Sequence, residues 1–174
     1  MTPSEQISHW TANGGMLGRL RLAASGAGLC KLALGRESDA SFHTWLARVA
    51  RPSGLIHQRT PFIDQALAEI DAYLAGGLRT FETPLDLRGT PFQRRVWSEV
   101  ARVPYGMTVS YGEIAMRIGR PRAARAVGAA NGANPLPLFV PCHRVVAADG
   151  ALRGYGGGLD VKAALLQLER TALG

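Results

Sequence analysis

Lysine, cysteine and long apolar runs are all scarce in this chain of 174 residues. No apolar run reaches the roughly 18 residues that a membrane span needs. The first residues also lack the basic and apolar segments of a signal peptide. We therefore expect a soluble, cytoplasmic protein with no membrane partner, whose cysteines stay reduced.

Residues that bind metals are also few and dispersed. The two cysteines, Cys30 and Cys142, lie far apart, and the four histidines show none of the usual ligand spacings. Cys30 alternates in phase with Leu32 and Leu34, which is the pattern of a buried strand residue. The sequence therefore predicts no metal site, a structural role for Cys30, and Cys142 as the cysteine that remains for chemistry.

Acidic residues are scarce in the second half of the chain. Residues 1–89 carry nine Lys and Arg against eight Asp and Glu, whereas residues 90–174 carry eleven against five. Only Lys31 and Lys162 are lysines, and arginine can bind phosphate oxygens in a planar, two-pronged geometry that lysine cannot copy. This basic half favours a polyanionic partner, although codon bias alone can also give an arginine-rich chain.

The first half, residues 1–88, has the pattern of a small α/β domain with a short antiparallel sheet. Its predicted elements are strands over 16–23, 28–34 and 83–87 and helices over 38–50 and 60–75. The second helix starts at Thr60-Pro61, a cap followed by a first-turn proline. No chemistry can be recognised in this half.

The second half, residues 89–174, has the pattern of a mostly helical domain. Its predicted helices are 90–103, 111–118, 122–130 and 159–172. The middle two are short and separated by a tight Gly-containing turn, which is typical of a helix-turn-helix. The alanines of helix 122–130 also suit a close-packed core helix, but Arg122, Arg125 and Gly128 share one face. We interpret that face as a contact for a phosphate chain, because small residues there allow close approach.

The segment with recognisable chemistry is Pro141-Cys142-His143-Arg144-Val145. A free thiol has a pKa of roughly 8.5 and needs a base to become a good nucleophile at neutral pH. His143 can be that base only if the chain turns at Cys142, and Pro141 favours such a turn. Glu169, at the edge of the apolar face of the last helix, is the candidate partner of His143. The alternative is that Glu169 reaches solvent or a surface arginine. With the pairing, we predict a lowered pKa for Cys142.

Two features follow the cysteine. Asp149-Gly150 is a hairpin turn signal, so we expect a short hairpin around the active cysteine. The run Gly154-Tyr155-Gly156-Gly157-Gly158 is either a flexible loop or one wall of a base pocket. In the second case its N–H groups and phenol can hydrogen-bond a purine edge.

The cysteine segment resembles that of the O6-alkylguanine-DNA alkyltransferases, also called methylated-DNA–protein-cysteine methyltransferases. The resemblance covers roughly residues 90–173, and the first half is similar to the family's variable α/β domain. Further matching segments occur in the family's order, namely Ser110-Tyr111, 124–128, Asn134-Pro135, Gly154-Tyr155, Leu159, Lys162, Leu165-Leu166 and Glu169.

The resemblance implies repair of O6-alkylguanine, and of O4-alkylthymine, in double-stranded DNA by transfer of the alkyl group to Cys142. It implies nucleotide flipping, a single turnover per molecule, no cofactor and a monomer, with cooperative binding along DNA left open. The catalytic residues that it implies are Cys142, His143, Glu169, Asn134, Tyr111 and Lys162. The implied DNA contacts are Arg125, Tyr111, Ser110, Ala124, Gly128, Arg122 and Arg94, and the implied base pocket comprises Tyr155, Gly156, Val145 and Pro137.

Particular roles follow from the same resemblance. Arg125 would replace the flipped base, and Tyr111 would push the 3′ phosphate. Asn134 would hold the turn before the cysteine, while Tyr155 and the Gly156 amide would stabilise the guanine oxygen, assisted by a proton from Tyr111 or Lys162. Gly156 stands where some relatives have serine, and the four-cysteine zinc module of some fusions is absent from the sequence. We therefore expect no phosphotriester repair and no transcriptional role.

Three other classes of protein compete with this interpretation. A non-catalytic alkyltransferase-like protein would replace the cysteine, usually by tryptophan, so Cys142 argues against it. A Cys–His hydrolase would need no basic half. A transcription factor would read the major groove with polar side chains, which the alanines of helix 122–130 do not offer.

Overall fold

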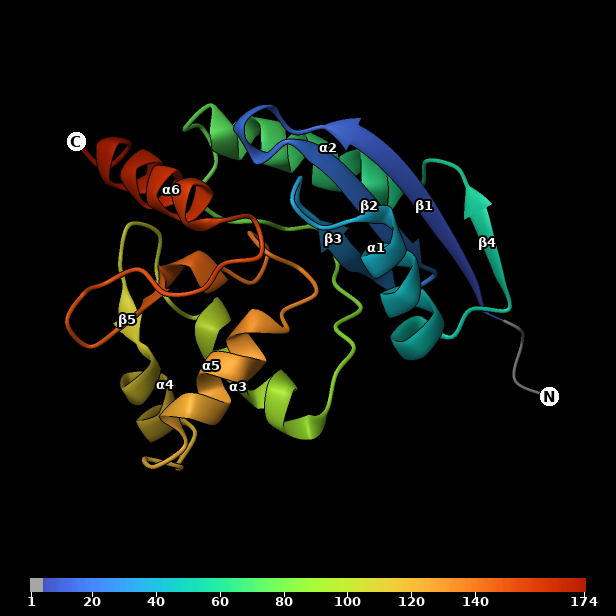
Figure 1. Ribbon diagram of the computed structural model, residues 1–174. Helices are drawn as coiled ribbons and strands as arrows, with labels where there is room; N and C mark the ends of the chain where they lie inside the picture. Colours follow the sequence, from blue (N-terminus) through green and yellow to red (C-terminus); the bar gives the residue numbers. More distant parts are fainter. Residues whose placement is uncertain (1–4) are drawn as a thin grey trace. The chain divides into compact units, whose positions relative to one another are not determined.

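The computed structural model describes residues 5–174, which divide into two compact units (Figure 1). One unit ends at Arg88 and the other comprises Gly89–Gly174. Both units combine helices with strands, so the predicted mixed α/β class is confirmed. No helix in the part of the chain that the structure describes has the length and hydropathy of a membrane span.

The N-terminal unit is built on a four-stranded sheet with the strand order β3-β2-β1-β4. Its strands are β1 (Gln6–Asn13), β2 (Arg19–Ser25), β3 (Gly28–Ala33) and β4 (Gly54–His57). The first three are antiparallel neighbours, but β4 lies parallel to β1 at the edge of the sheet. The predicted antiparallel sheet is therefore wrong for β4. Sequence patterns miss β1 and β4 because β1 has few apolar residues and β4 has only four residues.

Two helices pack on this sheet, and each begins at a capping residue that the sequence indicates. They are α1 (Asp39–Trp45), which continues into the π-helical turn η2 (Leu46–Ala50), and α2 (Pro61–Leu74). Ser38 caps α1 by accepting from the Ser41 amide, and Thr60 caps α2. The predicted strand 83–87 is wrong, because only Leu85 forms a bridge, to Leu29. Pro84 has no amide hydrogen with which to extend that ladder.

Cys30 lies in the core of this unit. Its side chain is fully buried and belongs to a cluster with Ile7, Phe42 and Leu46. Burial raises the pKa of the Cys30 thiol to about 12, so the thiol stays protonated at neutral pH. The prediction that Cys30 is a buried structural cysteine is confirmed.

The C-terminal unit is mostly helical. Its elements are α3 (Pro91–Ala101), β5 (Val109–Ser110), α4 (Tyr111–Arg117), α5 (Ala124–Gly132), η3 (Cys142–Arg144), β6 (Val145–Val146) and α6 (Leu159–Thr171). Thr90 and Ser110 each form a capping box, and these boxes fix the starts of α3 and α4. The buried indole of Trp97 on α3 donates to the Ala130 carbonyl on α5 at 2.7 Å and so positions α5. All four predicted helices are present.

The predicted hairpin around the active cysteine is wrong. The strand β6 pairs instead with β5, in parallel, with Val109 opposite Val145. The chain does make a tight turn at Gly150, which has a φ of 80°. The Ala147 amide donates to the Ala151 carbonyl at 3.0 Å across this turn, but no strand of the described chain returns along β6. The Val145 carbonyl on β6 accepts a hydrogen bond from Lys162 at 2.7 Å. The β5–β6 pairing instead places Ser110, the cap of α4, beside the segment that follows the cysteine.

Candidate active site

Cys142 starts the short 3₁₀ turn η3, so the chain does turn at the cysteine. Pro141 precedes the turn with a φ of −77°, and its carbonyl accepts from the Arg144 amide at 2.9 Å. The Cys142 side chain is only 6% exposed, and the cysteine forms no disulfide. The turn predicted from Pro141 is confirmed, and it allows a base from the adjacent residue to face the same site.

Two asparagine side chains hold the main chain around the cysteine. Asn134 donates from Nδ2 to the Val140 carbonyl at 2.8 Å and accepts from the Leu136 amide at 3.0 Å. Asn131, which is buried on α5, donates to the Cys142 carbonyl at 3.3 Å. Asn134 therefore lies where the resemblance implied. Asn131 was missed by sequence reasoning, although a polar residue on the buried face of an alanine-rich helix was a usable signal.

The Glu169 carboxylate holds the His143 side chain in place. Both Glu169 and His143 are fully buried, and His143 Nε2 lies 2.7 Å from Glu169 Oε1. Arg144 donates to the same carboxylate from Nε at 3.0 Å and from Nη2 at 2.9 Å, and the Gly106 amide donates to it at 2.9 Å. The predicted pairing of His143 with Glu169 is confirmed, and Glu169 does not reach solvent. The arginine that it binds is the buried Arg144, which sequence reasoning overlooked although it adjoins the histidine.

His143 has the protonation state of a proton acceptor. Burial lowers its pKa, while the hydrogen bond that it donates to Glu169 opposes this effect, so the imidazole is neutral at neutral pH. A carboxylate only accepts hydrogen bonds, so a neutral imidazole facing it must donate from Nε2. The lone pair of His143 is therefore on Nδ1. This tautomer is assigned from the hydrogen bond with Glu169.

The resting thiol of Cys142 is not activated. Burial raises its pKa to about 11. The Asn134 amide, the charge of Lys162 and the backbone N–H groups of Cys142 and His143 all act in the opposite direction. The predicted lowering of this pKa is therefore wrong for the protein without DNA. The free energy needed to desolvate the thiolate exceeds the stabilisation that these donors and the Lys162 charge give it.

Lys162 and Tyr111 meet at one main-chain carbonyl. The buried Lys162 ammonium donates to the Val145 carbonyl at 2.7 Å and to the Arg153 carbonyl at 2.9 Å. The Tyr111 hydroxyl donates to the same Arg153 carbonyl at 3.3 Å. Lys162 therefore ties the loop before Tyr155 to β6, while burial lowers the pKa of its ammonium.

The base-pocket residues are only partly open in this structure. Val145 is fully buried, whereas Pro137 and Tyr155 are half-buried. The Tyr155 ring stands edge-on to the His143 ring with centroids 6.5 Å apart. Gly156 is exposed, and a side-chain carbon added there would meet no atom within 4 Å. The structure thus brings Tyr155 to the histidine and leaves room for a larger side chain at Gly156.

The candidate DNA contacts are distributed over α3, the start of α4 and the region of α5. Arg125 is exposed on the helix, together with Ala126 and Ala129, whereas the opposite face is buried. Arg122 lies in the turn before the helix, so the predicted shared face of Arg122 and Arg125 within one helix is wrong. Gly128 lies beside Tyr111, and Ala124 is half-buried at the helix start. Arg94 is exposed on α3, away from these residues in the sequence.

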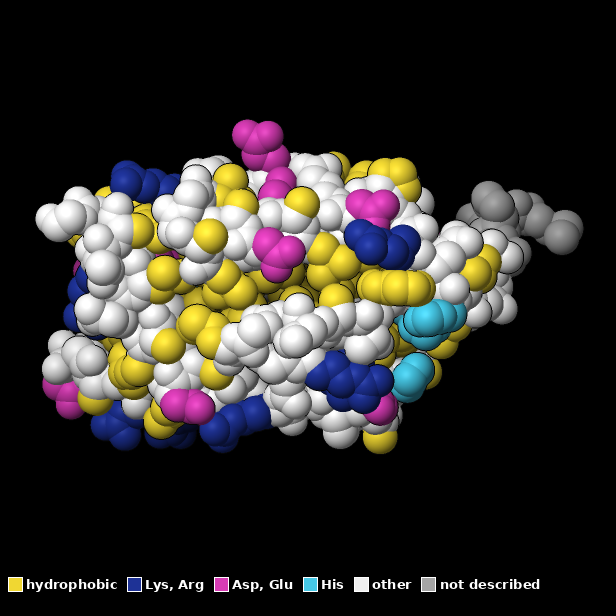
Figure 2. Space-filling view, turned by 90° about the horizontal axis from the view of Figure 1, so that it is seen from above, with side chains coloured by type: hydrophobic (Ala, Val, Ile, Leu, Met, Phe, Trp, Pro, Cys, Tyr) yellow, Lys and Arg dark blue, Asp and Glu magenta, His cyan; other side chains and the backbone are white. Residues whose placement is uncertain are grey.

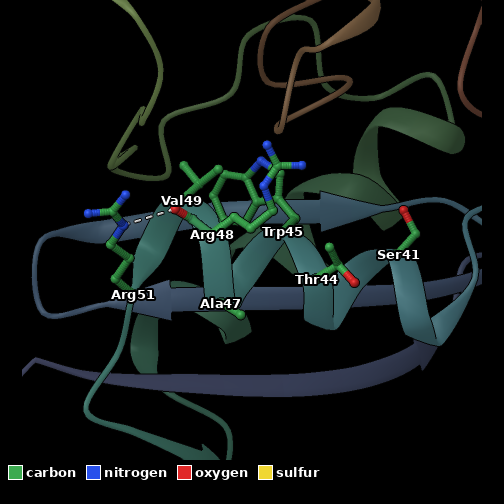
Figure 3. Close-up of a pocket in the computed structure, with 7 residues that line it drawn as sticks. All are labelled: Ser41, Thr44, Trp45, Ala47, Arg48, Val49 and Arg51. Carbon is green, nitrogen blue, oxygen red and sulfur yellow. Dashed lines mark hydrogen bonds between the residues drawn. The ribbon is translucent and has the colours of Figure 1, made fainter.

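The N-terminal unit offers weaker candidates. Figure 3 shows a pocket of about 540 Å³ on α1 and η2, lined by Ser41, Thr44, Trp45, Ala47, Arg48, Val49 and Arg51. No cysteine, histidine or carboxylate lines it, so it holds no strong nucleophile or base. Histidine side chains also gather on the surface (Figure 2), where the His9 ring lies 5.2 Å from His57 and 6.2 Å from His43. Within residues 5–174, no such cluster is arranged to hold a metal ion.

Comparisons with known proteins agree across both units. Residues 15–87 match the ribonuclease-like domain, and residues 91–171 the DNA binding domain, of 6-O-methylguanine DNA methyltransferase. The constitutive methylated-DNA–protein-cysteine methyltransferase of Bacillus subtilis (strain 168) is 39% identical over 165 residues, covering 94% of this chain and 96% of that protein.

Mycobacterial relatives are more similar over a shorter stretch. The methylated-DNA–protein-cysteine methyltransferase of Mycobacterium tuberculosis (strain ATCC 25618 / H37Rv) is 58% identical over 106 residues, which is 61% of this chain. That alignment spans 64% of the length of the mycobacterial protein. The crystal structure of Mycobacterium tuberculosis OGT in complex with DNA superposes with a TM-score of 0.81 at 43% identity, covering 95% of this chain and 94% of that one. This chain therefore belongs to the 6-O-methylguanine DNA methyltransferase family.

Proposed function

We propose that this protein repairs duplex DNA by transferring the alkyl group of O6-alkylguanine to the sulfur of Cys142. The observation that carries the proposal is the arrangement around the buried thiol, in which a neutral His143 is oriented by Glu169. A similar protein has been crystallised with DNA, which supports DNA as the partner. The net positive charge of residues 90–174 supports the same partner.

DNA recognition uses the exposed side of α5. The small side chains of Ala126 and Ala129 let the helix approach the minor groove closely, and Arg125 enters the duplex in place of the damaged base. Tyr111 contacts the 3′ phosphate and helps to rotate the nucleotide outward. The extruded base then lies between the Cys142 turn and the loop that carries Tyr155. Extrusion is necessary because guanine O6 lies on the major-groove edge of the base, out of reach of a protein that approaches from the minor groove.

The transfer balances as a displacement at the alkyl carbon. A water relays the thiol proton of Cys142 to His143 Nδ1, and Glu169 stabilises the resulting imidazolium. The sulfur–carbon bond forms while the bond between the alkyl carbon and guanine O6 breaks, with its electron pair passing to guanine. Tyr155 and the Gly156 amide stabilise the charge on O6, and a proton from Lys162 or Tyr111 neutralises the departing base.

The raised pKa of Cys142 delays loss of the thiol proton until the substrate is bound. Because burial raises that pKa to about 11, little thiolate exists before DNA arrives. The proton leaves only when the substrate carbon is in place to receive the sulfur. The donors that already act on the sulfur, from Asn134 and the backbone of Cys142 and His143, then stabilise the charge that develops during transfer.

The product explains why each molecule acts once. The carbon–sulfur bond of a thioether is stable and no group of the site cleaves it, so the alkylated Cys142 is not regenerated. Every group used in the transfer belongs to one chain, so the proposed acting unit is a monomer, and no cofactor enters the balance. O4-alkylthymine presents the same alkyl–oxygen bond and is proposed as a second substrate.

The experiment is a repair assay with a duplex that carries one O6-methylguanine. Digestion of the DNA after incubation should show conversion of O6-methylguanine to guanine in proportion to the protein added. Conversion should stop when each protein molecule has reacted once, and Cys142→Ala should bind the duplex without converting it. Turnover well beyond one per molecule, or conversion by Cys142→Ala, would contradict the proposal.

A further inference from the structure

The loop between β6 and α6 presents an arginine immediately before Gly154-Tyr155. The main chain of this residue, Arg153, is fixed because its carbonyl accepts from Tyr111 at 3.3 Å and from Lys162 at 2.9 Å. Its side chain is exposed and forms no ion pair with a carboxylate of the described residues. Arg153 therefore combines an anchored backbone with a guanidinium that is available to a ligand.

The positive charge of Arg153 also affects the Tyr111 hydroxyl, which donates a hydrogen bond to the Arg153 carbonyl. Burial raises the pKa of Tyr111, the nearby Cys142 raises it further, and the positive charge of Arg153 opposes both effects. The phenol of Tyr111 is therefore close enough to sense both the reactive sulfur and the guanidinium. This places Arg153 at the approach to the reactive cysteine rather than elsewhere on the basic surface.

We propose that Arg153 binds a phosphodiester of the extruded nucleotide, together with the Tyr111 hydroxyl, and so positions the alkylated base for transfer. This inference rests on the proposed function. The Tyr111 hydroxyl contacts the main chain of Arg153, and its pKa responds to the Arg153 charge. The guanidinium and the phenol can therefore supply charged and neutral donors to the oxygens of one phosphate. When the phosphate arrives, the Tyr111 hydroxyl exchanges the Arg153 carbonyl for a phosphate oxygen, while Lys162 keeps the loop in place.

The contact belongs to a late stage of the reaction. Arg125 is on α5, which faces the duplex from the first encounter, whereas Arg153 is on the loop that borders Tyr155. Lys162 ties this loop to Val145, three residues after Cys142. Only a nucleotide that has left the base stack brings its phosphate to this loop. Arg153 should therefore act on the transfer step and leave the initial binding of undamaged duplex unchanged.

The test compares Arg153→Ala and Arg153→Lys with the unaltered protein under single-turnover conditions. At saturating protein, Arg153→Ala should react with an O6-methylguanine duplex about tenfold or more slowly, because a charged hydrogen-bonded contact is lost. Arg153→Lys should recover part of the rate, since it keeps the charge but not the two-pronged geometry. All three proteins should react equally with free O6-benzylguanine, which has no phosphate.

Arg102→Ala is the matched control, because Arg102 is also an exposed arginine of this unit but is paired with Glu99. It should react with the duplex at the rate of the unaltered protein. Equal losses on duplex and free base for Arg153→Ala would assign the residue to the fold of the loop and overturn the inference. A loss confined to the affinity for undamaged duplex, or no loss at all, would also overturn it. Failure of the unaltered protein to transfer would instead refute the proposed function.

Discussion

Among single residues, Glu169 has the most demanding environment. It is a fully buried carboxylate that accepts from His143, Arg144 and the Gly106 amide. A buried carboxylate is tolerated only while its donors are present. Arg144 also donates to the Val103 carbonyl at 2.7 Å, and its guanidinium lies over the Tyr105 ring. Arg144 thus links the pair of His143 and Glu169 to the surrounding structure.

The first prediction concerns Arg144. Replacing it with alanine removes the charged partner of a buried carboxylate, so Arg144→Ala should lower the free energy of unfolding by about 3–5 kcal/mol. Urea unfolding measures this change. Arg102→Ala breaks a pair with an exposed arginine and should cost only about 0–1 kcal/mol. Similar costs for the two variants would show that Arg144 does not hold the carboxylate.

The second prediction concerns the Cys142 thiol. Because burial raises its pKa to about 11, alkylation by iodoacetamide in the native protein should have a pH midpoint above the roughly 8.5 of a free thiol. In the unfolded protein the midpoint should return to the ordinary value. The folded pKa is the higher one, so this thiol also makes stability fall as pH rises from the unfolded value toward about 11. A native midpoint below that of a free thiol would contradict the assignment.

The contacts of a site residue could be predicted only where the sequence itself indicated the interacting residue. The Cys142 turn and the pairing of His143 with Glu169 followed from Pro141 and from the position of Glu169 on its helix. Arg144 and Asn131 were not predicted, because which polar residues converge on a site depends on packing between elements that are distant in sequence. The sign of the Cys142 shift was wrong for the same reason, since the depth of burial decides it.

Among the elements, helices were predicted better than strands. Thr60, Thr90 and Ser110 mark helix starts through local capping bonds that the sequence itself specifies. The strand β4 and the parallel pairing of β5 with β6 depend instead on partners elsewhere in the chain. The hairpin expected around the cysteine is limited to a turn that the Ala147 amide and the Ala151 carbonyl close, and β6 pairs with β5 instead.

The third prediction belongs to α5. If Arg125 replaces the extruded base, Arg125→Ala should slow transfer from duplex DNA about tenfold or more, because extrusion costs a few kcal/mol that the arginine offsets. Reaction with free O6-benzylguanine requires no extrusion and should proceed almost normally. Rapid mixing followed by quenching measures both rates. Arg94→Ala should instead weaken duplex binding modestly and reduce its salt dependence. Equal losses on both substrates for Arg125→Ala would mean that the arginine supports the fold of α5.

Over the whole molecule, chemistry and charge are concentrated in the same unit. Residues 90–174 hold Cys142, its proposed base and eleven of the basic residues against five acidic ones. The N-terminal unit contains the other cysteine, Cys30, whose burial raises its pKa to about 12. The chain thus contains two buried thiols, but His143 and the Asn134 amide adjoin only one of them. That difference makes the site of alkylation the most direct test of the account.

The measurement is intact mass spectrometry after incubation with a duplex containing O6-methylguanine, followed by peptide mapping. The protein mass should increase by one methylene group per molecule, and the added group should be found only on the peptide that contains Cys142. Cys142→Ala should show no increase although it still binds the duplex. A methyl group on Cys30, or an unchanged mass in a protein that has converted the lesion, would contradict the central claim.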